Sequence, residues 1–405
     1  MADVVERYNS EGILTASGSD ISLVQTFNGE FPEGSGDITA PADGDVIKVS
    51  EDISVSTTIS PTNSFTLQAK TNPVTISHSG SQTQLYNLST VTDFTLKNVT
   101  ISGFGINNAN GGAITIQNGD STVNLTTDNV TFSGNTAGIY GGAIYSERSL
   151  TISGETTFIG NKALNDGAGA IYVERGKRLT ISGKTTFNGN TADYGGAIYV
   201  SHDQIIFEGD GSVGTFTNNV STETKYMHAI GHDMRIYEGS LIFRNNGTYS
   251  FDGGITVPQG STDIDEAQVT IAGREDCATN RYQLWDVTIS NGGKLTANLD
   301  YINNIESTPI KLTDSVSLVE LTNDILDQSA TIKSSTGNGT FILEYIAAEG
   351  NVQKESLVIS SGRIDAKGCM KATIEVGSDA TFSPGNSVGH LDIDGSNYID
   401  WRNVD

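Results

Sequence analysis

Along most of the chain, apolar and polar residues alternate over short runs. In Thr151–Ser153 and Thr180–Ser182 an isoleucine stands between two hydroxyl residues, so the isoleucine faces one side of a strand and the hydroxyls the other. Gly and Asn interrupt these runs, and no window has the 3.6-residue period of an amphipathic helix. The pattern predicts many short strands and almost no helix.

Two motifs recur and alternate with each other. The first, F-x-x-N, has five copies whose phenylalanines are 26, 29, 29 and 27 residues apart. A fixed period of this length indicates one structural unit repeated along the chain. The copies of F-x-x-N are Phe132 to Asn135, Phe158 to Asn161, Phe187 to Asn190, Phe216 to Asn219 and Phe243 to Asn246. The second motif, G-G-A-I, is followed by tyrosine in three of its copies. Its copies are Gly111–Ile114, Gly141–Tyr145 (second glycine Gly142), Ala168–Tyr172 (second residue Gly169), Gly195–Tyr199 (second glycine Gly196) and, in degenerate form, Gly253–Ile255.

Short strands repeating every ~28 residues predict an all-β fold, a right-handed parallel β-helix in which each repeat is one turn. Dividing 405 residues by that period gives about 12–14 turns. Stacking would align one internal column of Phe132, Phe158, Phe187 and Phe216 and another of Asn135, Asn161, Asn190 and Asn219. In the second column the Asn amides would satisfy backbone groups at a corner. The Gly-Gly pairs supply positive φ and close backbone approach at a second corner.

Composition narrows the function. The net charge is −25 and the pI about 4.4. Both values argue against nucleic-acid binding, because proteins that bind nucleic acid need clustered Lys and Arg. No apolar stretch reaches the ~18 residues that a membrane-spanning helix needs. Two cysteines are too few for a disulfide scaffold and match no metal-binding spacing. We therefore expect no cofactor and no metal.

With these motifs, the chain resembles the chlamydial polymorphic membrane proteins, whose passenger regions carry many copies of G-G-A-[ILV] and F-x-x-N. The resemblance covers about residues 98 to 255, and Ala380–Gly389 is similar to a P-G-N-S-[IV]-G stretch near the end of many autotransporter passengers. It implies a surface-exposed or secreted autotransporter passenger at the bacterial outer membrane, followed in the family by an autochaperone region and a membrane barrel. We expect the present chain to be trimmed before both.

Three regions are predicted. Residues 1–60 form an irregular N-terminal region with a cap, because an uncovered end turn would expose an unpaired strand edge. Residues 61–257 form the regular β-helix, and residues 258–405 continue it with degenerate turns. The segment Ser221–Glu238 is a side loop.

Several groups of residues could carry chemistry, and each has a simpler structural explanation. Gly385–Gly389 matches G-x-S-x-G, but that nucleophile motif requires a following helix and a distant histidine. His228 and His232, followed by Asp233, have metal-ligand spacing only on a helix. Two further groups are acidic: one is Asp263, Asp265 and Glu266, and the other is Asp392 and Asp394. Such pairs hold calcium or protonate glycosidic bonds in some β-helix enzymes, whereas chance pairs are expected among 48 acidic residues. The sequence leaves open whether either pair forms a site.

Two functions remain. The first is a non-enzymatic adhesin that binds a host-surface protein or glycan. The alternative is a β-helix polysaccharide lyase or glycoside hydrolase, which should show a groove of aromatic residues and carboxylates; a phage fibre is a third and more distant reading. Self-association is also left open.

The predicted binding residues lie between each Asn and the next Gly-Gly. These segments differ in length, which is typical of surface turns that carry recognition. They are Thr136 to Tyr140, Lys162 to Gly167 with Asp166, and Thr191 to Tyr194, and the longer segment Ser221–Glu238 is a fourth candidate. Stacking would place the three in one row, so that several weak contacts act together.

Overall fold

The computed structural model describes residues 4–18, 42–78, 83–222, 232–257, 260–273, 287–298, 311–312, 317–323, 332–334, 340–345, 355–370, 372–384 and 392–393. Within these ranges every regular element is a strand and no helix occurs, which confirms the all-β prediction. The chain divides into two compact units. The first comprises Met1–Asp203 and Asn218–Thr222, and the second Gln204–Thr217 and Glu223–Asp405.

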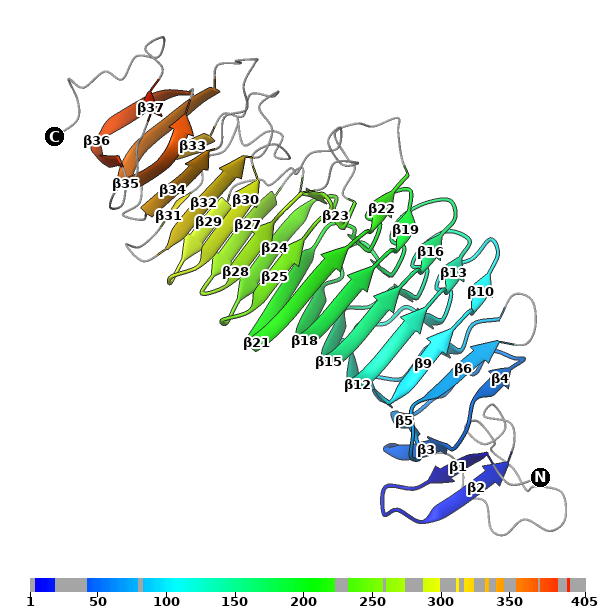
Figure 1. Cartoon of the computed structure of the whole chain (residues 1–405). Helices are drawn as coiled ribbons and strands as arrows, with labels where there is room; N and C mark the ends of the chain where they lie inside the picture. The colour runs from blue at the N-terminus through cyan, green and yellow to red at the C-terminus, as the bar shows by residue number, and fades with distance from the viewer. Residues whose placement is uncertain are drawn as a thin grey trace, which may run out of the picture. The chain divides into compact units, whose positions relative to one another are not determined.

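The first unit is a stack of turns whose strands form three parallel sheets. Strands of neighbouring turns pair residue by residue, as in the match of Leu150 to Ile159 with Leu179 to Asn188, and Figure 1 shows these arrows side by side. The first sheet contains β3 (Asp45–Val49), β4 (Ile53–Val55), β5 (Phe65–Ala69), β6 (Val74–His78), β8 (Asp93–Lys97), β9 (Val99–Ser102), β12 (Val123–Ser133), β15 (Leu150–Ile159) and β18 (Leu179–Asn188). The second contains β7 (Tyr86–Leu88), β11 (Ile114–Ile116), β14 (Ile144–Ser146), β17 (Ile171–Val173) and β20 (Ile198–Val200). The third contains β10 (Gly105–Ile106), β13 (Thr136–Ala137), β16 (Lys162–Ala163), β19 (Thr191–Ala192) and β22 (Val220–Ser221).

The second unit is also built from parallel strand pairs. Its long β21 pairs with two shorter strands of the following turn, and pairing continues turn by turn. Its strands are β21 (Gln204–Thr217), β23 (Met234–Ile236), β24 (Gly239–Arg244), β25 (Thr248–Phe251), β26 (Ile255–Thr256), β27 (Gly260–Asp265), β28 (Gln268–Ile271), β29 (Val287–Ser290), β30 (Lys294–Asn298), β31 (Lys311–Leu312), β32 (Leu318–Asn323), β33 (Ile332–Ser334), β34 (Thr340–Tyr345), β35 (Glu355–Met370), β36 (Ala372–Pro384) and β37 (Asp392–Ile393).

The fold is thus a parallel β-solenoid, with about eight turns rather than the 12–14 predicted. The prediction divided the whole chain by one period. Among the described residues, however, strands of the second-sheet type end at β26, and the later strands pair only in a long ladder of the first-sheet type and in the β35–β37 pair.

The internal columns of the first unit hold its turns together. The rings of Phe132 and Phe158 stack at 5.0 Å, and those of Phe158 and Phe187 at 4.9 Å. The asparagines form a fully buried ladder in which the side-chain oxygens of Asn161, Asn190 and Asn219 accept bonds from the Asn of the preceding turn and their amides donate to a Phe carbonyl. For Asn190, the oxygen accepts from both the backbone N and Nδ2 of Asn161, each at 3.0 Å. Its own Nδ2 donates to the Phe158 carbonyl at 3.0 Å and to Asn219 Oδ1 at 2.9 Å. The Phe and Asn of the motif are therefore coupled across turns.

The Gly-Gly corner is also specific. Gly141 and Gly195 have φ of 65° and 58°, and Ala168 occupies the same position with φ of 64°. The second glycine lies against backbone, because a Cβ on Gly142 would overlap the carbonyl oxygen of Gly169 in the next turn. The first glycine thus serves conformation and the second serves close stacking.

The last F-x-x-N copy lies elsewhere in the repeat. In the second unit Phe243 pairs with Phe207, while Phe216 pairs with Phe251 and stacks on it at 4.5 Å. Asn246 is exposed, has φ of 56°, and lies in the bend between β24 and β25. Phe243 and Asn246, which count as a copy of the motif, therefore do not extend the columns predicted for the first four copies, because the four residues of F-x-x-N fit either bend of the turn and only strand register distinguishes them.

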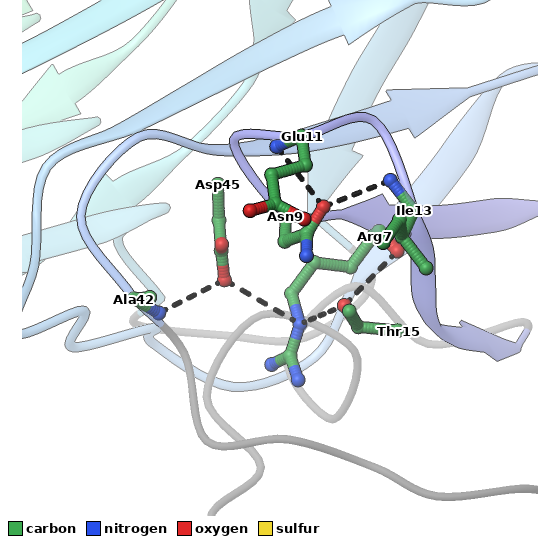
Figure 2. Close-up of polar contacts among 7 residues, drawn as sticks. All are labelled: Arg7, Asn9, Glu11, Ile13, Thr15, Ala42 and Asp45. Atoms are coloured by element: carbon green, nitrogen blue, oxygen red, sulfur yellow. Dashed lines mark hydrogen bonds and ion pairs between the residues drawn. The ribbon is translucent and has the colours of Figure 1, made fainter.

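An antiparallel hairpin covers the first turn. Strands β1 (Val5–Tyr8) and β2 (Leu14–Gly18) pair with each other, and β1 pairs antiparallel with β3, whose other edge pairs with β5. Arg7 of β1 is fully buried, and its Nε lies 3.1 Å from Thr15 Oγ1 and 3.6 Å from Asp45 Oδ2. Figure 2 shows both contacts as dashed lines. The hairpin thus occupies the edge of β3 that does not pair with β5.

Candidate ligand-binding face of the second sheet

The second sheet of the first unit carries a row of tyrosines on its outer side. In each G-G-A-I-Y copy the isoleucine is fully buried, and alternation places the next residue outside. Tyr145, Tyr172 and Tyr199 pair in register, with ring centroids 5.6 Å and 5.2 Å apart along the row. These three residues, together with Tyr140, are called the tyrosine row below.

The turns fold back onto this row. The ring of Tyr140, which belongs to the turn before Gly141, lies 4.3 Å from Tyr172 and 6.3 Å from Tyr145. Ala168 packs into the same cluster, and Tyr145 and Tyr172 are each only 5% exposed. The predicted binding turns therefore form part of an aromatic cluster whose outer members, Tyr140 and Tyr199, remain partly exposed.

Carboxylates border the row. The hydroxyl of Tyr145 donates to Glu174 Oε2 at 2.9 Å and to Glu147 Oε1 at 3.3 Å. Burial, followed by the hydrogen bond to Glu174, raises the pKa of Tyr145 well above its usual value. Burial and then the carboxylate of Asp166 raise the pKa of Tyr140 to about 12. The phenols are thus protonated donors at neutral pH.

The row ends at Tyr145, and a hollow begins there. The position paired with Tyr145 in the preceding turn is Thr115. Its hydroxyl donates to the Asn110 carbonyl at 3.0 Å and accepts from Gln84 Nε2 at 2.8 Å. Beside it lies a cavity of about 450 Å³, called the polar hollow below. It is lined by Gln84, Ile106, Ala109, Asn110, Thr115, Gln117, Asn118, Tyr145 and Glu147.

The predicted turn residues divide into two groups. Thr136, Lys162 and Thr191 lie in strands β13, β16 and β19 of the third sheet, in register, rather than in turns. Their side chains are outside, because the alanine that follows each one is buried. Tyr140, Asp166 and Tyr194 lie in the turns proper, and Tyr194 forms an isolated parallel β-bridge with Gly167.

The candidate catalytic groups of the second unit are engaged on its surface. On β27, Asp263 accepts from Ser261 Oγ at 3.2 Å, and Asp265 accepts from Ser290 Oγ at 2.9 Å and from Asn291 Nδ2. Glu266 is exposed at the following bend. In this part of the structure, therefore, both aspartate side chains accept hydrogen bonds from hydroxyl or amide groups.

The remaining candidates are only partly described. His232 and Asp233 are buried, and Asp233 Oδ2 accepts from the backbone N of Gly253 at 2.7 Å. Asp392 lies in β37. His228, Asp394 and Gly385–Gly389 lie outside the described residues, as do residues 223–231 of the predicted side loop. The described part of that segment includes β23, which pairs with β26 and so belongs to the stack. In the described ranges, no three His, Cys, Asp or Glu residues come together as metal ligands.

The comparisons with known proteins identify the repeat. The Chlamydia polymorphic membrane protein repeat matches residues 129–147 and 184–201. The chain carries repeats of this family. Each matched segment contains strand residues, one asparagine of the ladder and one Gly-Gly corner, so the match coincides with the elements that stack the turns.

No curated protein and no solved structure matches the chain. In the residues that the structure describes, no helix is long and apolar enough to cross a membrane.

Sequence reasoning missed the polar hollow. Its walls come from four separate segments, around residues 84, 106–110, 115–118 and 145–147. One signal was present: Thr115 follows Gly-Gly-Ala-Ile where three later copies have tyrosine. A missing large side chain in an otherwise regular outer row predicts a depression at that turn.

Proposed function

We propose that this chain is the surface-exposed passenger of a bacterial cell-surface protein and acts as a non-enzymatic adhesin toward a host-surface protein or glycan. The observation that carries the proposal is the repeat of the polymorphic membrane protein family, a family of surface proteins. The repeat positions are occupied in stacking: the phenylalanines, the Asn ladder and the glycines face the interior or adjacent backbone. Recognition then falls to outward side chains.

The third-sheet side supplies outward side chains of the right kind. Lys162 is exposed next to Leu164, which is 43% exposed, and Thr136 pairs with Lys162 in the preceding turn. An exposed aliphatic side chain beside a cation and a hydroxyl suits contact with a protein or glycan surface. Repetition along the stack allows several weak contacts to combine.

The experiment compares two matched triple variants of the purified chain in a host-cell binding assay. The test variant is Thr136→Ala, Lys162→Ala and Leu164→Ala. The control replaces the same kinds of residue on the outer face of the first sheet: Thr126→Ala, Lys184→Ala and Ile159→Ala, where Ile159 is 39% exposed.

We expect the test variant to lose at least tenfold in cell binding and the control to bind like the parent, with both melting within a few degrees of it, because all six side chains are on the surface. Full cell binding by the test variant would contradict this assignment of the surface. Absence of cell binding by the parent chain would contradict the adhesin proposal itself.

The enzyme alternative is supported by one specific observation, the two carboxylates of Glu147 and Glu174 that share the Tyr145 hydroxyl. Paired carboxylates are the catalytic groups of most glycoside hydrolases. Both, however, are engaged by a phenol, and Glu147 also accepts from the backbone N of Asn118 at 2.7 Å. Polysaccharide cleavage that is lost in Glu174→Gln would favour the enzyme over the adhesin.

A further inference from the structure

The polar hollow results from one departure in the repeat. Three successive turns place Tyr145, Tyr172 and Tyr199 in the outer row. The turn before them has Thr115 at this position, and the turn before that has Asn87. The shorter side chains leave the space that a further ring would occupy. The resulting volume of about 450 Å³ lies in the range of about 300–1,000 Å³ typical of small-molecule sites.

One part of the hollow is apolar. Ile106 of β10 and Ala109 from the turn after it contribute aliphatic carbon, and Tyr145 contributes an aromatic side chain. An aromatic ring with aliphatic neighbours favours ligands that have a C–H face. A purely ionic ligand would gain nothing from these three residues.

The other part offers hydrogen-bonding groups without protein partners. Gln117 and Asn118 are exposed, and their side-chain amides make no hydrogen bond to other described residues. Glu147 lies next to them, held by its bond from the Asn118 backbone N. Two free amides and one oriented carboxylate together provide donors and acceptors for several hydroxyl groups.

Charge excludes other ligand classes. No lysine, arginine or histidine is found among the described residues that line the hollow, and the chain carries a net charge of −25. Phosphate, sulfate and carboxylate ligands would therefore find no cationic partner in this lining. A divalent cation would find a single carboxylate, fewer than the oxygen ligands it requires.

We propose that the polar hollow binds one neutral sugar residue, a hexose or N-acetylhexosamine, with its C–H face toward Ile106, Ala109 and Tyr145 and its hydroxyls toward Gln117, Asn118 and Glu147. This inference rests on the proposed adhesin function and narrows its ligand to a neutral glycan. The site lies on the second-sheet face, and its partner residues differ from those tested above.

The test is NMR titration of the full chain with glucose, galactose, mannose and N-acetylglucosamine, and with 3′-sialyllactose as the anionic probe. Side-chain amide signals of Gln117 and Asn118 should shift on addition of at least one neutral sugar. In Thr115→Tyr, which refills the row, the apparent Kd should rise at least tenfold.

The double variant Gln117→Ala and Asn118→Ala should weaken binding similarly. It keeps the test decisive if Thr115→Tyr does not fold, because both side chains are exposed and lack protein bonds. Gln68→Ala, an amide on β5 outside the hollow, should bind like the parent chain.

Failure of all four neutral sugars to shift these amides, or unchanged binding in the double variant, would overturn the proposal. Binding of 3′-sialyllactose through its charged group alone would do the same. Either result leaves the adhesin proposal intact as long as cells still bind the parent chain, so the two failures are distinguishable. Loss of cell binding in the double variant would support the sugar site directly.

Discussion

Replacing Asn190 by alanine should destabilise the first unit more than any surface change. The side chain is fully buried and takes part in four hydrogen bonds, two accepted from Asn161 and two donated to Phe158 and Asn219. Alanine removes the acceptor of the Asn161 backbone N and the side-chain donor to the Phe158 carbonyl, whereas Asn161 Nδ2 keeps its bond to Phe132 and Asn219 Oδ1 keeps its bond from the Asn190 backbone N. At about 2 kcal/mol for each of the two buried groups that lose this partner, the expected loss is about 4 kcal/mol.

The end of the ladder provides an internal comparison. Asn135 makes only three such bonds, to the Phe104 backbone N, to the Ile101 carbonyl and to Asn161. The preceding turn has Phe104 in place of an Asn, which supplies no side-chain amide. Asn135→Ala should therefore cost about 1 kcal/mol less than Asn190→Ala.

Urea denaturation followed by far-UV circular dichroism measures these differences as shifts in midpoint at constant slope. Asn188→Ala is the control, because Asn188 is on the surface and receives one weak bond of 3.3 Å from Asn218 Nδ2. It should lose less than about 0.5 kcal/mol. Equal midpoint shifts for the Asn188 and Asn190 variants would refute the buried-ladder account.

Three further predictions concern other parts of the first unit. Gly142→Ala should destabilise by about 3 kcal/mol or more, because its Cβ overlaps backbone of the next turn; Gly134→Ala, at φ of 59° in open space, should cost only about 1–2 kcal/mol in the same urea assay. Burial raises the pKa of Tyr172 above that of an unfolded tyrosine. The contribution of this group to the free energy of unfolding is therefore complete below pH ~10 and is lost at higher pH, where the unfolded tyrosine ionises. Tyr172→Phe should reduce the alkaline loss of stability by up to ~1.4 kcal/mol per pH unit. Asp45→Ala should cost about 3–5 kcal/mol by leaving the Arg7 guanidinium buried without its carboxylate, and the double change with Arg7→Leu should recover part of that in thermal melts.

The repeat was predictable because it is local in sequence. Each F-x-x-N copy carries its corner within four residues, including the third position, where Gly134 and Gly189 have positive φ. Alternation of Thr and Ile then specifies which side chains are inside. These features suffice for the solenoid, for the Phe stack and for the Asn ladder between Asn135 and Asn219.

What the sequence did not specify depends on register. Phe243 and Asn246 have the right letters but lie at the other bend, because pairing with Phe207 places them there. The contact of Arg7 with Asp45 joins two strands across a long connection. The polar hollow is a still stronger case, since Gln84 and Glu147 come together only after two turns are stacked. Four-residue motifs contain no information about such pairings.

The energies of the two kinds of position explain where recognition can reside in this solenoid. Replacing a ladder asparagine such as Asn190 removes four buried hydrogen bonds to neighbouring turns, at about 4 kcal/mol. The ring pairing of Tyr145 and Tyr172 adds about 0.5–1.5 kcal/mol to the energy of their burial. The stack accommodates a short residue in this outer row, because Thr115 pairs in register with Tyr145. Each turn keeps the same interior and can present a different exterior, so a hollow of new chemistry arises from one outward residue without disturbing the stack. The same reasoning places ligand specificity in the outer row and the third-sheet surface, and it assigns to the motif residues the task of holding those surfaces in register.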